Sequence, residues 1–131
     1  MRSFWASLGV VAVVMAHASA ALILGPQPAP TDPVLGTYRC TGTGDDGAAY
    51  ELTLTVTAHQ DAYRLVWTDQ GTPAFAGFGV RVSDVLAVIF SGPHGVASVA
   101  AYRMAPGELV GDWTDGDGAV RTETCRRGQP A

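Results

Sequence analysis

Eight short strand-like segments, each followed closely by turn-forming residues, constrain the fold of this chain more than any other feature. The clearest is 49–58, in which Tyr50, Leu52, Leu54 and Val56 alternate with polar residues, as in an antiparallel strand with one buried face. The breaks contain Gly, Asp, Ser and Pro, which favour turns. Because connections this short make neighbouring strands antiparallel, the pattern predicts a meander. The predicted strands are 34–41, 49–58, 62–68, 73–80, 85–91, 96–104, 108–114 and 119–125.

A meander of this size can close on itself and remove both sheet edges. We therefore predict an all-β fold, an eight-stranded antiparallel up-and-down barrel. The alternative is a β-sandwich, because Cys40, Trp67 and Cys125 superficially match an immunoglobulin domain. However, the residue two before Cys125 is Glu123 and not tyrosine, and the long connections of a Greek key are missing. The interior of such a barrel holds packed side chains or one small ligand.

The last two predicted strands form a hairpin that returns the chain to its beginning. Leu109 and Trp113 lie on one face at a period of two, and Asp115 to Gly118 form the turn between the strands. The strand after this turn ends in Cys125, and the only other cysteine, Cys40, lies in the first predicted strand. We predict a Cys40–Cys125 disulfide, with two free thiols as the alternative. The predicted structural core comprises Tyr50, Leu52, Leu54, Trp67, Leu109 and Trp113.

The N-terminal part has the pattern of an export signal. Residues 1–20 contain an early arginine, an apolar run and a small-residue cleavage site, Ala18-Ser19-Ala20. A proline-rich spacer follows at 21–33, then the β-barrel domain at 34–127 and a short tail at 128–131. The predicted location is periplasmic or extracellular. The alternative is an uncleaved signal that anchors the chain in a membrane, the only membrane contact that we expect.

Composition excludes several functions. The formal charge of −4 argues against nucleic acid, whose binding depends on clustered basic residues. All basic residues are arginines, so no Schiff-base lysine or phosphate-loop lysine exists. His59 and His94 lie in predicted turns without metal-ligand spacing, and the Asp115-x-Asp117 pair fails the calcium-loop pattern at the later positions. We predict no metal, no cofactor and no enzymatic activity.

Glu123 is the unusual polar residue of the predicted barrel. If Cys125 points inward, a period of two places Glu123 and Arg121 on the same inward face. A buried carboxylate needs a partner, and Arg39, Arg103 or Arg121 could supply one. This group is either a structural ion pair or a polar anchor for a ligand, so Glu123, Arg103 and Arg121 are candidate ligand-binding residues. A second candidate surface is the outer wall at 85–90, which is apolar on both faces and contains Val85 and Ile89.

The spacing of glycine and aromatic residues resembles that of small exported bacterial β proteins, mostly uncharacterised and sometimes described as fibronectin-binding. The matching residues include Gly36-x-Tyr38, Tyr63-x-x-x-Trp67, Gly77-x-Gly79 and Gly107-x-Leu109-x-Gly111-x-Trp113. More distantly, Gly111-x-Trp113 is similar to the G-x-W of lipocalin-like and avidin-like barrels. The resemblance implies an exported β domain and supplies no catalytic residues.

Two functions follow as expectations. The first is an exported, non-catalytic binding module whose partner is a protein, a glycan or a small ligand. Its site is the barrel mouth, ringed by the turns at 42–47, 69–71, 92–95 and 115–118, or the outer wall. The second is a periplasmic protease inhibitor that acts through the N-terminal segment, by analogy with small barrels of that kind.

Overall fold

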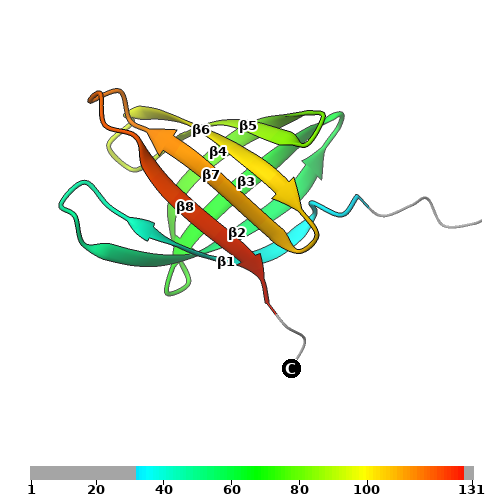
Figure 1. Ribbon diagram of the computed structural model, residues 1–131, viewed down its shortest axis with the longest axis horizontal. Coiled ribbons are helices and arrows are strands. Elements are labelled where there is room, and N and C mark those ends of the chain that lie inside the picture. Colours follow the sequence, from blue (N-terminus) through cyan, green and yellow to red (C-terminus); the bar gives the residue numbers. More distant parts are fainter. Residues whose placement is uncertain (1–31, 129–131) are drawn as a thin grey trace, which may run out of the picture.

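The computed structural model describes residues 32–128, which form one closed barrel of eight antiparallel strands in sequence order (Figure 1). The predicted barrel is therefore confirmed, and the sandwich alternative is not. In the described part of the chain, no helix is long and apolar enough to cross a membrane. The strands are β1 (Gly36–Thr43), β2 (Ala49–His59), β3 (Ala62–Asp69), β4 (Thr72–Val82), β5 (Val85–Ser91), β6 (Ala97–Ala105), β7 (Glu108–Thr114) and β8 (Arg121–Arg127).

Each strand lies where the sequence predicts one, and the differences are at the ends. The first strand begins at Gly36 and not at 34, because a turn precedes it, in which the Leu35 amide donates to the Asp32 carbonyl at 3.1 Å. The last strand runs to Arg127 and not to 125, because Arg127 still pairs with Tyr38 of β1. Tight turns join several strands, and Gln60, Gln70 and Ser83 adopt φ values of 52°, 47° and 56°, as short hairpins require.

The first and last strands close the barrel, and the disulfide lies across this closure. Cys40 of β1 pairs directly with Cys125 of β8, and the two are bonded, as predicted. Both cysteines are fully buried. The two strands are antiparallel and pair from Tyr38 to Gly42, and the Cys40–Cys125 pair is at the centre of this paired stretch.

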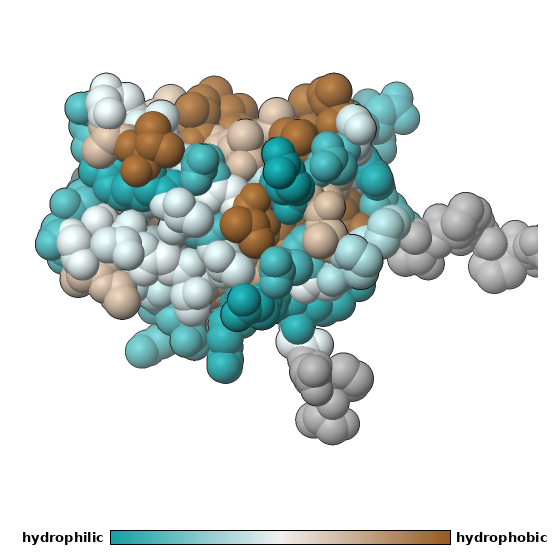
Figure 2. Space-filling view, in the orientation of Figure 1, coloured by the Kyte–Doolittle hydropathy of each residue, from teal (hydrophilic) through white to brown (hydrophobic). Residues whose placement is uncertain are grey.

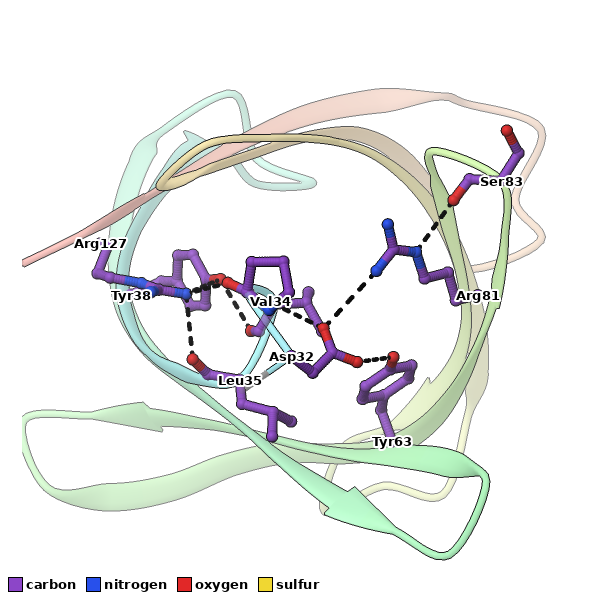
Figure 3. Close-up of polar contacts among 9 residues, drawn as sticks. Asp32, Val34, Leu35, Tyr38, Tyr63, Arg81, Ser83 and Arg127 are labelled. Atoms are coloured by element: carbon purple, nitrogen blue, oxygen red, sulfur yellow. Dashed lines mark hydrogen bonds and ion pairs between the residues drawn. The ribbon is translucent and has the colours of Figure 1, made fainter. Parts of the chain in front are cut away.

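One end of the barrel is closed by the residues that precede β1 (Figure 3). Val34 is buried, and the Asp32 carboxylate accepts hydrogen bonds from the Val34 amide at 3.0 Å and from the Tyr63 hydroxyl. Arg127 donates to the carbonyls of Pro33 and Leu35. Asp32 and Pro33, which the sequence assigns to the spacer, therefore pack against the barrel. The predicted signal at 1–20 and the rest of the spacer lie outside the described residues.

The core fills the barrel from this closed end to its middle. Leu54, Trp67 and Leu109, three of the predicted core residues, are buried. Leu52 and Trp113 are partly buried and pack against this core, and Tyr50 is also partly buried. They lie towards the other end of the barrel, where they border open space.

Candidate functional site

The open end of the barrel contains a cavity of about 600 Å³. The turns β1–β2, β3–β4, β5–β6 and β7–β8 meet at this end, the left end in Figure 1, and supply its rim. These are the four turns that the sequence predicts around the mouth. This volume is within the range of pockets that bind small molecules in proteins. Its lining comprises Gly44, Asp45, Tyr50, Leu52, Trp67, Asp69, Ala74, Phe75, Phe90, Gly92, Pro93, His94, Val96, Ser98, Tyr102, Trp113, Asp115 and Glu123.

Aromatic side chains form much of the cavity wall. Phe90 is at the centre of the group: its ring centroid lies 5.0 Å from that of Trp67, 5.9 Å from that of Phe75 and 6.4 Å from that of Trp113. Tilted and edge-on arrangements of this kind are the ones that aromatic pairs prefer. The wall therefore offers a flat apolar group a surface made of several aromatic rings.

Glu123 lies inside the cavity as a buried carboxylate, with 3% of its surface exposed. The hydroxyl of Tyr102, also buried, donates a hydrogen bond to its Oε2. Burial raises the pKa of Glu123, and the nearby Tyr102, Trp67 and Tyr50 side chains lower it in part. The pKa values of Tyr50 and Tyr102 are raised, first by burial and then by the charge of Glu123. Both tyrosines thus remain protonated and act as hydrogen-bond donors at neutral pH.

The strand register explains how side chains from distant strands reach Glu123. Gly42 of β1 and Gly111 of β7 pair with Glu123 on its two sides. Beyond these glycines, Tyr50 of β2 pairs with Gly42, and Tyr102 of β6 pairs with Gly111. The five residues form one row across five neighbouring strands, β2, β1, β8, β7 and β6.

The two glycines in this row leave the space that the tyrosine rings occupy. A Cβ atom at Gly42 would lie 2.5 Å from the Tyr50 hydroxyl oxygen, and one at Gly111 would lie 2.6 Å from Cδ1 of Tyr102. Real Cβ atoms do not approach other heavy atoms so closely. Each tyrosine therefore lies over a glycine and reaches towards the carboxylate. The sequence singles out Glu123, but it does not identify these two tyrosines as its partners.

None of the arginines proposed as partners of Glu123 forms an ion pair with it. Arg39 pairs with Glu51 at 3.4 Å on the surface, and Arg103 lies 3.9 Å from Asp84. Arg121 is turned towards the rim, where its Nη2 atom lies 3.0 Å from Asp45 and 2.7 Å from Asp117. The predicted arginine partner is wrong because the register gives Glu123 tyrosine neighbours instead.

Among residues 32–128, two groups bring three potential metal-ligand atoms together, but other bonds already engage most of those atoms. Cys40 and Cys125 lie beside Glu123, but their sulfur atoms are joined in the disulfide. Asp45, Asp115 and Asp117 gather at the rim. There Arg121 already binds two of them, and its hydrogen bond lowers the pKa of Asp117 to about 2.

The outer wall carries an exposed apolar surface. Phe78 of β4 pairs with Ile89 of β5, which pairs with Val99 of β6, and all three side chains are about half exposed. Hydrophobic side chains gather along the upper edge of the molecule in Figure 2, where Figure 1 shows β5 and β6. Ile89, predicted as a wall residue, is part of this surface, whereas Val85 is partly buried at the end of its strand. The protease-inhibitor expectation rests mainly on 21–31, outside the described residues.

Comparison with known proteins supports the fold. No protein-family model matches the chain, and no curated protein does. Similar solved structures include a redesigned β-barrel, b11L5F_LGL, with a TM-score of 0.62 and 19% identity over 72% of this chain and 91% of that one. They also include a redesigned β-barrel, mFAP1, bound to DFHBI, with a TM-score of 0.57 and 21% identity over 71% of this chain and 94% of that one. At these identities the likeness shows the barrel fold, and it does not test the resemblance to exported bacterial proteins.

Proposed function

We propose that this domain is a non-catalytic barrel that binds a small ligand in its mouth cavity. One observation carries the proposal: the buried carboxylate of Glu123, which accepts a hydrogen bond from Tyr102, faces a cavity of about 600 Å³ with aromatic walls. Two glycines beside Glu123 leave the space that the rings of Tyr50 and Tyr102 occupy. Burying a carboxylate opposes folding unless polar partners compensate. A polar group built into an otherwise apolar barrel is what a site needs to orient a ligand.

Two further points support binding over catalysis. Tyr50 and Tyr102 have raised pKa values and stay protonated, so they can orient a ligand but are poor bases or nucleophiles at neutral pH. The mFAP1 barrel, of the same fold, has a solved structure with DFHBI bound. Steady turnover of any member of a broad substrate panel would contradict the non-catalytic part of the proposal.

The test is a titration of the ¹⁵N-labelled protein with a panel of small aromatic compounds, followed by NMR. The indole N–H signals of Trp67 and Trp113 should shift, because both rings line the cavity. Ser98→Phe should fill the cavity from β6 and weaken binding at least about 10-fold. Ala101→Phe is the matched control, because Ala101 lies on the exposed face of the same strand. Ala74→Phe, from β4, replaces Ser98→Phe if that variant does not fold.

The result can separate the mouth from the wall. If the compounds shift signals around Phe78, Ile89 and Val99 and Ser98→Phe leaves the affinity unchanged, the ligand site is the outer wall and the cavity proposal is wrong. If no compound shifts any signal of the barrel, a small-ligand role is wrong altogether.

We also propose that the domain works outside the cytoplasm. A fully buried disulfide that joins the first and last strands supports this, because structural disulfides persist mainly in oxidising compartments. N-terminal sequencing of the protein from its native cell should begin at Ala21. Recovery of the full chain, with an intact Met1, from the reducing cytoplasm would contradict this proposal.

A further inference from the structure

The charge at the mouth end of the barrel is strongly one-sided. Asp45, Asp69, Asp115 and Glu123 line the cavity; among the described residues that do so, His94 is the one basic side chain and none is an arginine. The chain contains no lysine. Arg121 lies at the rim, but Asp45 and Asp117 balance its charge. A cleft lined by one sign of charge concentrates ligands of the opposite sign.

The cavity wall also suits a cation. The guanidinium carbon of Arg121 lies 5.1 Å from the ring centroid of Trp113, so one aromatic ring of the wall already contacts a positive group. Trp67, Phe75 and Phe90 are further aromatic residues that line the same space. Aromatic faces attract cations through their quadrupole, and more strongly where water is excluded.

We propose that the ligand of the mouth cavity is an organic amine, with an apolar or aromatic body and a cationic nitrogen that pairs with Glu123. This inference rests on the proposed small-ligand function and names the chemical class of the ligand. The ammonium group donates to the Glu123 carboxylate, and the aromatic walls enclose the body. The rim aspartates attract the cation towards the mouth.

Binding of this kind is coupled to the protonation of Glu123. Burial raises the pKa of Glu123; below that raised pKa the empty protein holds a neutral carboxylic acid, and an amine that binds there must displace the proton. Amine affinity therefore rises with pH up to the pKa of Glu123 in the empty protein. Tyr50 from β2, Trp67 from β3, Tyr102 from β6 and the buried disulfide of β1 and β8 lie next to Glu123. The other titratable side chains that line the same cavity are Asp45, Asp69, His94 and Asp115. Arg121, on the same strand, is held at the rim by its two aspartates.

The experiment compares three probes of one shape and different charge: 2-phenylethylamine, 2-phenylethanol and phenylacetate. Affinities are measured by NMR titration of the wild-type protein and of Glu123→Gln, which removes the charge and keeps the shape. We expect the amine to bind the wild type about 10- to 100-fold more tightly than the alcohol, the range that one hydrogen bond to a charged group supplies. Phenylacetate should bind most weakly. In Glu123→Gln the amine should lose this advantage and its pH dependence, while the alcohol keeps its affinity.

Failure of this inference differs from failure of the proposed function. If the alcohol or phenylacetate shifts the cavity signals with an affinity equal to or greater than that of the amine, the cavity binds ligands and the amine class is wrong. If Glu123→Gln weakens all three probes equally, the carboxylate shapes the site and does not recognise charge. If none of the probes shifts a cavity signal, both the amine class and the binding function fail.

Discussion

Replacement of Gly111 by alanine tests whether the row around Glu123 is built as described. The new Cβ atom would lie 2.6 Å from the carbonyl oxygen of Ala101 and 2.6 Å from Cδ1 of Tyr102. The first contact is with backbone of the neighbouring strand, which cannot rotate away. The second is with the ring that donates to Glu123. Either β7 must move away from β6, or Tyr102 must leave the carboxylate.

The expected magnitude combines two opposing effects. Forcing an extra methyl group into a packed interior costs about 1–3 kcal/mol. Glycine-to-alanine substitution restricts the unfolded chain and returns about 0.4–1 kcal/mol where the backbone is compatible. Gly111 has an ordinary strand conformation, so this gain applies, and the net loss of stability should be about 1–2 kcal/mol.

Urea unfolding of the oxidised protein, followed by tryptophan fluorescence, measures the change. Gly44→Ala is the matched control, because a Cβ atom there meets nothing nearer than 3.4 Å and the backbone φ is not positive. That variant should be as stable as the wild type or slightly more so. The reasoning is refuted if Gly111→Ala is as stable as Gly44→Ala, since Tyr102 then does not lie over Gly111.

Three further predictions concern Glu123, Asp32 and the disulfide. Burial raises the pKa of Glu123 above its ordinary value of 4.5, so the folded protein holds the proton more tightly than the unfolded chain. In urea unfolding at a series of pH values, the wild type should therefore lose stability relative to Glu123→Gln as the pH rises from 4.5 through the raised pKa. A stability difference that stays constant with pH would contradict the burial of Glu123. At the closed end, the hydrogen bond from the Tyr63 hydroxyl lowers the pKa of Asp32 below 3.8. Asp32→Asn should therefore lower the stability of the fold by about 1–2 kcal/mol at pH 7, and this loss should shrink as the pH falls from 3.8 through the lowered pKa. Equal stability of the two proteins at pH 7 would show that Asp32 does not anchor this end. The two cysteines of the disulfide are 85 residues apart, so replacing both Cys40 and Cys125 by serine should remove about 4–5 kcal/mol of stability in the chain-entropy model. The melting temperature should fall while the β circular-dichroism spectrum persists. An unchanged melting temperature would contradict a stabilising role of the bond.

The sequence predicts the strands and their order because both depend on local signals. Alternation along each strand and turn residues between strands act over a few positions, and short turns leave only antiparallel neighbours. The mouth cavity is less predictable. The alternation that makes Leu54 buried also applies to Tyr50 and Leu52, and only the three-dimensional shape shows that the latter two border open space.

The tyrosine partners of Glu123 depend on register, which is only partly encoded in short segments. The tight turn between β6 and β7 fixes the pairing of Tyr102 with Gly111, because counting back from Ala105 and Glu108 leads to that pair. Pairing of Cys40 with Cys125 likewise places Gly42 opposite Glu123. The longer β7–β8 turn sets the remaining pairing, between Gly111 and Glu123, and its register is not evident from residue types.

A crystal structure of the protein grown with 2-phenylethylamine tests the central claim most directly. The account predicts density for the ring in the mouth cavity, against the side chains of Trp67, Phe90 and Trp113, with the nitrogen within hydrogen-bond distance of the Glu123 carboxylate. A mouth filled by its own side chains, or an amine bound only on the outer wall, would contradict the claim that the barrel mouth is the ligand site.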